Sequence, residues 1–225
     1  MRREIITTAD GSTTIHLPDW DESYHSKHGA IQEAYHVFIK NGLSLFEGRA
    51  VSIMEIGFGT GLNAFITFLE SQKKNWLIEY TGVEAYPVAG EEVRRLNYVE
   101  ELGVQNEDAA FRTMHESDWE KPVSISANFK LTKRRQFFHE IDDVAKFDLI
   151  YFDAFGFRVQ PELWSAEIFS KMYSALKPEG ILVTYAARSP IKKAMVDSGF
   201  EVFKMAGPPG KREMFRAHKS EISSL

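Results

Sequence analysis

The sequence predicts a doubly wound α/β fold with a mostly parallel sheet. Apolar, strand-like segments alternate with amphipathic helical ones, and a glycine-rich turn joins the first core strand to a helix. No repeat or low-complexity linker interrupts this order, and alternating strands and helices form parallel sheets with right-handed crossovers. The 225 residues, 44% of them hydrophobic, suffice for one core, so we expect one compact unit.

The residues before the first core strand are expected to form an N-terminal extension. Residues 5–20 mix Thr, Asp and Gly with short apolar pieces, a pattern typical of a ribbon. Apolar residues in 30–46 follow the spacing of one helix face, and Asn41-Gly42 would end that helix. We therefore divide the chain into residues 1–48, a ribbon and helix packed on the core, and a main domain of residues 49–225.

Each core element follows from its pattern of apolar residues, turns and prolines. The expected strands are residues 50–56, 77–83, 146–153, 181–187, 200–205 and 213–217, and the expected helices are 62–71, 88–101, 161–176 and 190–197. Residues 123–132 alternate around the turn-like Ala127-Asn128 and predict a small inserted hairpin. Pro161 fits the first turn of its helix, and residues 177–180 read as a turn.

Composition excludes several classes of protein. No apolar stretch approaches the roughly 20 residues of a membrane span, and the N-terminus is polar, so we expect a cytoplasmic protein that does not contact a membrane. The absence of cysteine removes disulfides, thiolate metal ligands and cysteine nucleophiles. His25 and His28 lie three residues apart, but no third ligand is evident nearby, and we expect no metal site.

Charge is unevenly distributed along the chain. The net charge is −5, which argues against a uniformly basic surface that would bind any nucleic acid. From Arg188 onward, however, Lys and Arg outnumber Asp and Glu eight to four, and a second basic cluster comprises Lys130, Lys133, Arg134 and Arg135. These clusters are either solvated faces or contacts for phosphates.

The segment Glu55-Ile56-Gly57-Phe58-Gly59-Thr60-Gly61 places glycines where a strand turns into a helix. Glycines there let the backbone approach a ligand closely and present amides at a helix N-terminus. The dinucleotide motif G-x-G-x-x-G would need a third glycine where Leu62 stands. The spacing is G-x-G-x-G instead, which resembles the first motif of class I S-adenosylmethionine-dependent methyltransferases.

Glu84 follows the second core strand and matches the ribose-binding carboxylate of that superfamily. A carboxylate can accept hydrogen bonds from both ribose hydroxyls and would repel a 2′-phosphate, which disfavours NADP. The alternative is that the glycines only make a sharp turn and that Glu84 is an exposed strand end. The glycines, Glu84 and the segment 176–180 together favour the cofactor.

Asp153 ends a buried strand at the edge where open α/β sheets bind their ligands. Methyl transfer is an in-line displacement whose nucleophile needs a free lone pair, so a carboxylate that orients an amine and accepts its proton is useful. We hypothesise that Asp153 has this catalytic role. The alternative is that Asp153 only caps the following turn.

A more specific resemblance runs from Tyr24 to Ala217. The matching pieces are Tyr24-His25-Ser26, Gly29-Ala30, Glu33, Gly57-Phe58-Gly59-Thr60-Gly61-Leu62-Asn63, Asp153-Ala154-Phe155, Pro161-Glu162-Leu163-Trp164 and Gly210-Lys211-Arg212-Glu213. The chain resembles the methyltransferase half of the MnmC family of bifunctional tRNA wobble-uridine enzymes. That resemblance implies a seven-stranded, Rossmann-like methyltransferase sheet and a methyltransferase domain over residues 49–225.

The resemblance also implies the reaction and the residues that serve it. The reaction is N-methylation of 5-aminomethyl-2-thiouridine at the tRNA wobble position, with S-adenosylmethionine as cofactor and the 5-methylaminomethyl form as product. The expected cofactor-binding residues are Tyr24, Ser26, Glu55, Gly57, Gly59, Thr60, Gly61, Asn63, Glu84 and Ala85. The expected substrate-binding residues are Glu33, Phe155, Lys211 and Arg212, and Asp153 is the expected catalytic residue.

The expected partners are tRNA and a separate enzyme that supplies the aminomethyl group, because we expect no fused oxidoreductase domain. Basic residues that could bind tRNA phosphates are Lys133, Arg134, Arg135, Lys192, Lys193, Lys211, Arg212 and Arg216. Two other functions remain open: a class I methyltransferase acting on a small-molecule amine, and a protein that binds S-adenosylmethionine as a sensor. Asp153 argues against the sensor.

Overall fold

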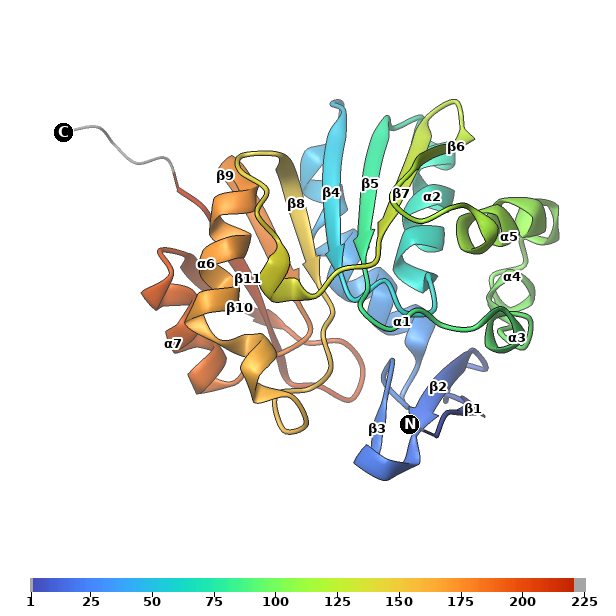
Figure 1. The fold of residues 1–225 in the computed structure, drawn as a ribbon, viewed down its shortest axis with the longest axis horizontal. Coiled ribbons are helices and arrows are strands. Elements are labelled where there is room, and N and C mark those ends of the chain that lie inside the picture. Colours follow the sequence, from blue (N-terminus) through green and yellow to red (C-terminus); the bar gives the residue numbers. More distant parts are fainter. Residues whose placement is uncertain (1, 221–225) are drawn as a thin grey trace.

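The main sheet of the computed structural model, which describes residues 2–220, has eight strands and the predicted doubly wound architecture (Figure 1). Its strands are β4 (Val51–Ile56), β5 (Ile78–Val83), β6 (Pro122–Ser126), β7 (Phe129–Arg134), β8 (Phe147–Phe152), β9 (Leu176–Thr184), β10 (Glu201–Ala206) and β11 (Glu213–His218). They are ordered β10-β11-β9-β8-β4-β5-β7-β6. The strands from β7 to β9 are all parallel, while β11 runs antiparallel to β9 and β10 antiparallel to β11.

Two hydrophobic clusters cover the two faces of this sheet. One cluster joins the sheet to α2 (Leu62–Lys74), α5 (Asp108–Glu116) and the N-terminal helices, with Phe65 and Phe38 at its centre. The other joins the sheet to α6 (Ala166–Ala175) and α7 (Ser189–Asp197). The strands between them are mostly apolar because both of their faces are buried, and the few polar residues among them include Glu55 and Asp148.

The predicted hairpin exists and extends the sheet. Its second strand, β7, pairs in parallel with β5 and is the outermost of the seven strands that form the predicted sheet, and β6 adds an antiparallel edge. The hairpin is thus part of the main sheet and brings Arg134, at the end of β7, next to the carboxyl end of β5.

Several expected boundaries were wrong. The helix expected at 88–101 is two short helices, α3 (Gly90–Val93) and α4 (Tyr98–Glu101), because Asn97 between them accepts from the backbone N–H of Thr13 at 2.7 Å and donates to the Gly11 carbonyl at 2.9 Å. The expected turn at 177–180 lies within β9, whose register shifts there to form a bulge. Helix α5 was not expected.

The helix expected at 30–46 is divided into three pieces. They are α1 (Ala30–Ala34), the π-helix η2 (Tyr35–Lys40) and the 3-10 helix η3 (Leu43–Phe46). Residues expected in the helix 161–176 form the 3-10 helix η6 (Pro161–Trp164) and then α6, separated by Ser165, whose side chain caps α6. The remaining 3-10 helices are η1 (Pro18–Trp20), η4 (Gln105–Glu107) and η5 (Phe138–Glu140).

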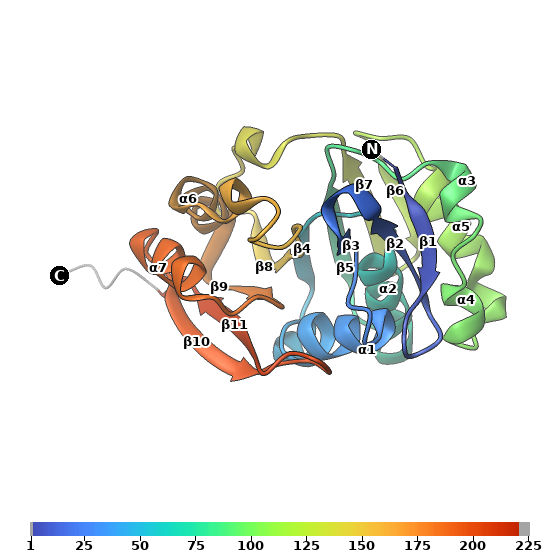
Figure 2. The ribbon, with the colours of Figure 1, turned by 90° about the horizontal axis from the view of Figure 1, so that it is seen from below.

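The N-terminal residues form a separate small sheet, which confirms the predicted ribbon. It consists of β1 (Glu4–Thr7), β2 (Thr13–Leu17) and β3 (Glu22–Ser23), in that order. This small sheet lies beyond the carboxyl ends of β4 and β5 (Figures 1 and 2). The division at residues 48 and 49 stays a prediction, and side chains from both parts share one core.

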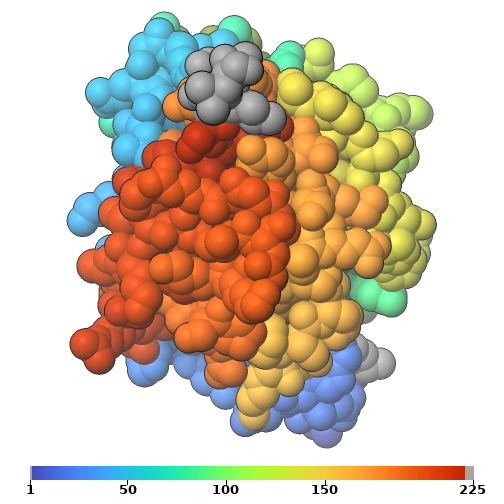
Figure 3. Space-filling view, turned by 90° about the vertical axis from the view of Figure 1, so that its left-hand side faces the viewer, coloured from blue at the N-terminus to red at the C-terminus, as the bar shows by residue number. Residues whose placement is uncertain are grey.

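The face at the β10 edge of the sheet is formed by the C-terminal third of the chain, in orange and red, with the blue N-terminal segment below it (Figure 3). In residues 2–220, no helix has the length and apolar character needed to cross a membrane.

Candidate active site

A cavity of about 1290 Å³ opens at the carboxyl ends of the parallel strands, between them and the N-terminal segment. Most of the predicted site residues line it. These are Tyr24, Ser26, Glu33, Gly57, Gly59, Thr60, Asn63, Glu84, Ala85, Asp153, Phe155, Lys211 and Arg212. Glu55 and Gly61 do not line it, so the fold brings thirteen of the fifteen predicted residues to one cavity wall.

The glycine turn is shaped by close packing as well as by access to the cavity. Gly57, Gly59 and Gly61 all have positive φ, at 89°, 50° and 72°. A Cβ on Gly57 would lie 2.6 Å from the Asp153 carbonyl oxygen, and one on Gly61 would lie 2.9 Å from His115 Nε2. Packing against neighbouring atoms is therefore enough to require glycine at positions 57 and 61. Gly59 lines the cavity and lies next to the Tyr24 ring.

Glu84 turns its carboxylate toward the glycine turn. Its Oε2 accepts from the backbone N–H of Gly59 at 3.0 Å, and its Oε1 accepts from the N–H of Tyr86 at 2.9 Å. Each carboxylate oxygen can accept a further hydrogen bond. The strand tip and the turn thus hold one acidic acceptor over the cavity, as ribose recognition requires.

Asn63 connects two carboxyl groups at the floor of the site. Its Nδ2 donates to Glu55 Oε1 and to Asp153 Oδ2, both at 2.9 Å. Glu55 is fully buried, and burial raises its pKa well above the usual value, so its neutral form is favoured. Glu55 therefore positions Asn63, and Asn63 in turn orients the Asp153 carboxylate.

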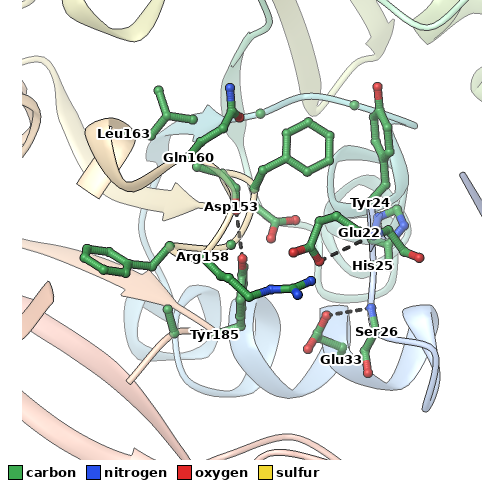
Figure 4. A pocket seen from close by; sticks show the side chains of 18 of the residues that line it. Glu22, Tyr24, His25, Ser26, Glu33, Asp153, Arg158, Gln160, Leu163 and Tyr185 are labelled. Carbon is green, nitrogen blue, oxygen red and sulfur yellow. Dashed lines mark hydrogen bonds between the residues drawn. The ribbon is translucent and has the colours of Figure 1, made fainter. Parts of the chain in front are cut away.

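Asp153 follows β8 and faces the cavity (Figure 4). Desolvation by the surrounding protein raises its pKa to about 7, and the negative charge of Glu33 adds to this effect. The hydrogen bond from Asn63 and the charge of Lys211 act in the opposite direction. A carboxyl group that titrates near neutral pH is suited to accept a proton during a reaction.

Glu33 and Lys211 form an ion pair that joins α1 to the loop between β10 and β11. Glu33 is 6% exposed and also accepts from the backbone N–H of Ser26 at 3.1 Å. The ammonium group of Lys211 lies 3.9 Å from the centre of the Tyr185 ring. Lys211 thus lines the cavity as one member of an ion pair, and its role in substrate binding stays a prediction.

Aromatic rings of the N-terminal segment close one side of the cavity. Phe155 packs edge-to-face against Trp20 and Tyr24, with ring centres 5.9 and 5.0 Å apart. Thr60 is 1% exposed, and its hydroxyl accepts from Tyr98 Oη at 3.0 Å. Thr60 therefore both lines the cavity and holds the Tyr98 hydroxyl by a hydrogen bond.

Sequence reasoning missed several residues of the site. Glu22 lies close to the Asp153 turn, since a Cβ on Gly156 would be 3.1 Å from its Oε2. Tyr185 donates to the Ala154 carbonyl at 2.9 Å, and the charges of Asp153, Glu33 and Glu22 all act on its pKa. Figure 4 shows Glu22, Glu33 and Asp153 turned toward a common space. Glu22 reaches this place only because the small N-terminal sheet packs across the ends of the main sheet.

A metal site is not suggested by the side chains of residues 2–220, among which no three His, Cys, Asp or Glu side chains gather as ligands. His25 packs inside the N-terminal segment, with Nδ1 at 3.0 Å from Thr14 Oγ1, and burial lowers its pKa to about 4. His25 is therefore a half-buried, hydrogen-bonded residue of the cavity lining whose neutral form is favoured.

The fold, the glycine turn and the strand-tip carboxylates define a methyltransferase of the S-adenosylmethionine-dependent type. The chain belongs to a family described as S-adenosyl-L-methionine-dependent methyltransferase, whose model matches residues 108–220, half of the chain. S-adenosylmethionine is accordingly the cofactor of this enzyme family.

Similar proteins indicate the subgroup of methyltransferases to which this chain is related. The chain is 28% identical over 227 residues to the tRNA 5-methylaminomethyl-2-thiouridine biosynthesis bifunctional protein MnmC of Cupriavidus metallidurans. The aligned region covers 94% of this chain and 33% of that protein. The chain is 24% identical over 241 residues to the protein of the same name from Hydrogenovibrio crunogenus, covering 99% and 35%. The chain thus spans about a third of the length of these relatives.

Solved structures confirm the fold. The crystal structure of MNMC2 from Aquifex aeolicus superimposes with a TM-score of 0.73 at 24% identity, covering 96% of this chain and 69% of that one. Spermidine synthase from Thermotoga maritima superimposes with a TM-score of 0.54 at 12% identity, covering 96% and 73%. Both comparisons show the same α/β fold with its N-terminal extension within the covered part.

Proposed function

We propose that this chain N-methylates the aminomethyl group of 5-aminomethyl-2-thiouridine at the tRNA wobble position. The observation that carries the proposal is Asp153, a carboxyl group with a pKa near 7 beside the glycine turn and within a cavity lined by further carboxylates. The name of the MnmC relatives supports the choice of nucleoside. The sequence resemblance and the residues lining the cavity lead to the same reaction.

The cavity suits the cofactor. Its volume of about 1290 Å³ exceeds the roughly 300–1,000 Å³ typical of small-molecule sites, so a cofactor and a nucleoside have room together. The proposed contacts are the glycine turn and Ala85 for the adenosine, Glu84 for the ribose hydroxyls, and Tyr24, Ser26 and Asn63 for the remainder. Thr60 contributes to the wall of this site, while Glu55 and Gly61 support it from behind.

When bound, S-adenosylmethionine supplies an electrophilic methyl group on a positively charged sulfur. The amine would take that methyl group through its lone pair, so it must first be uncharged. An amine that arrives as an ammonium ion gives one proton to the ionised Asp153 carboxylate, which Asn63 holds in the direction of the substrate. The methylated amine is again an ammonium ion, and Asp153 returns its proton to solvent before the next turnover.

Acidic side chains deep in the cavity select a cationic substrate group. Glu22, Glu33 and Asp153 surround Tyr185, and an aminomethyl group arriving as an ammonium ion complements their charge. Phe155, held by Trp20 and Tyr24, offers an aromatic face for the uridine base. We assign Glu33 and Phe155 to substrate binding, and Lys211 to holding Glu33 in place.

The partners follow from the reaction. The substrate is a tRNA that already carries the aminomethyl group, so a reaction that forms this group must precede methyl transfer. We propose that the chain works where tRNA is modified, in the cytoplasm.

The test compares three methyl acceptors under identical conditions. Intact tRNA bearing 5-aminomethyl-2-thiouridine, the free nucleoside and spermidine are each incubated with the enzyme and labelled S-adenosylmethionine. The proposal predicts that kcat/KM for the tRNA exceeds that for either small molecule by at least about 100-fold, since RNA contacts add several kcal/mol. A preference for spermidine or the free nucleoside would instead establish a small-molecule amine methyltransferase.

A further inference from the structure

Three arginines line the mouth of the cavity on one side. Arg158 follows β8, Arg188 follows β9, and Arg212 lies in the loop between β10 and β11. All three are exposed, and none forms a salt bridge with a carboxylate of residues 2–220. Arg158 donates to the Asp21 carbonyl at 3.2 Å, which orients its side chain without neutralising it.

The opposite side of the mouth has a different character. Its arginine, Arg3, is paired with Glu92 at 3.0 Å and donates to the carbonyl of Tyr86. Exposed Tyr86 and Phe137 pack edge-to-face there, with ring centres 5.8 Å apart. Uncompensated positive charge is therefore confined to the half of the mouth formed by segments after β8, β9 and β10.

The cofactor does not account for these charges. S-adenosylmethionine has no phosphate, and its one carboxylate is accompanied by a positive sulfonium and a positive amino group. Three exposed guanidinium groups around one opening reinforce one another's attraction for an anion from solution. The molecule as a whole has a net charge of −5, so the three arginines stand out against an acidic background.

We propose that Arg158, Arg188 and Arg212 bind the backbone phosphates of the RNA on either side of the nucleotide that enters the cavity. This inference rests on the proposed function and specifies which surface receives the RNA. One guanidinium group can donate two hydrogen bonds to the oxygens of one phosphate. Three such groups from separate segments of the protein can contact successive phosphates of a curved RNA chain. The cationic rim and the acidic interior together match a polyanion that carries one ammonium group.

Several other basic residues of the chain differ from these arginines because their charges are buried or paired with carboxylates. Lys133 is 1% exposed and donates to the His115 carbonyl at 2.6 Å. Arg134 pairs with Asp143, and Lys193 pairs with Asp197. In the basic cluster on the hairpin, Lys130 and Arg135 are exposed, and neither lines the cavity.

The experiment measures binding of 5-aminomethyl-2-thiouridine tRNA as a function of salt. Each of R158A, R188A and R212A should reduce the slope of log K against log salt by roughly 0.7–0.9, because each removes one released counterion. The KM for tRNA at 150 mM salt should rise about 5- to 10-fold per substitution. The Kd for S-adenosylmethionine and the melting temperature should stay at the wild-type values, which shows that the variants fold.

R94A and R95A are the matched controls, since both residues are exposed arginines outside the cavity. They should leave the slope unchanged. An unchanged slope in the variant that lacks all three arginines, or an equal loss in R95A, would overturn the assignment while leaving methylation of tRNA intact. Failure of the proposed function would appear differently, as the absence of methyl transfer to any tRNA by the wild-type enzyme.

Discussion

At the scale of single residues, Asp153 is the side chain on which the chemistry depends. Its position at the end of a buried strand could be predicted, because the mostly apolar residues 147–152 lead directly to it. Its environment could not, since Glu33 and Lys211 reach it from segments more than 50 residues away in the sequence on either side. The supporting role of Glu55 likewise depends on burial that only the packed sheet creates.

The first prediction concerns Asp153→Asn. The substitution keeps the shape of the side chain but removes the proton acceptor, so single-turnover methyl transfer should fall about 10²- to 10⁴-fold. The Kd for S-adenosylmethionine should stay within about twofold of wild type, as measured by calorimetry. Asp142→Asn, an exposed carboxylate outside the cavity, is the control. Full turnover by Asp153→Asn would remove Asp153 from the mechanism.

The second prediction concerns the pH dependence of kcat/KM. Asp153 must be ionised to accept a proton, and its pKa is about 7, so kcat/KM should rise with pH, reach half of its maximum near pH 7 and level off above about pH 8. Glu33 raises this pKa through its charge, so in Glu33→Gln the rise should move to lower pH. A rise that stays at the same pH in Glu33→Gln would show that another group controls it.

The third prediction links Asp153 to stability. Its pKa is about 7 in the folded chain and near 3.8 when unfolded, so the folded state binds more protons between these values. The free energy of unfolding therefore decreases as pH rises from about 4 to 7 and is constant above. Asp153→Asn should abolish this loss and raise Tm at pH 8 by roughly 2–4 °C, about 1 kcal/mol after allowance for solvent in the cavity. At pH 4 the two proteins should melt together, and a lower Tm for the variant at pH 8 would contradict this view.

At the scale of elements, the glycine turn shows why a motif can be both structural and functional. Its existence and place could be predicted from the spacing of the glycines. The sequence alone left open whether they served packing or a ligand, and the structure shows that packing requires Gly57 and Gly61. The irregular helices were harder to predict, because the break at Asn97 depends on contacts with the N-terminal segment that have no local signature.

The fourth prediction tests this packing. Gly57→Ala should destabilise the chain by roughly 2–4 kcal/mol, because its φ is 89° and its Cβ would collide with the Asp153 backbone. Gly48→Ala is a matched control, since Gly48 also has a positive φ, 79°, but nothing lies within 4 Å of the added atom. It should cost only about 1 kcal/mol. Equal losses in urea denaturation would show that the collision at Gly57 is relieved by movement of the strand.

At the scale of the whole molecule, the order of strands and helices determined the fold class, and the predicted sheet is confirmed. What could not be predicted is how the N-terminal segment completes the site. Glu22 and Trp20 belong to a short ribbon with no recognisable motif, and they reach the cavity because the small sheet lies across the ends of β4 and β5. The charge pattern that results, acidic inside and basic at one rim, is a property of the folded chain alone.

The measurement that tests the central claim most directly is nucleoside mass spectrometry of tRNA after reaction. Bulk tRNA from cells that lack the wobble methylation is incubated with the enzyme and S-adenosylmethionine carrying a labelled methyl group, then digested to nucleosides. The account predicts that the label appears in 5-methylaminomethyl-2-thiouridine, with a matching loss of the 5-aminomethyl form. Label in another nucleoside, or binding of the cofactor without any labelled nucleoside, would contradict it.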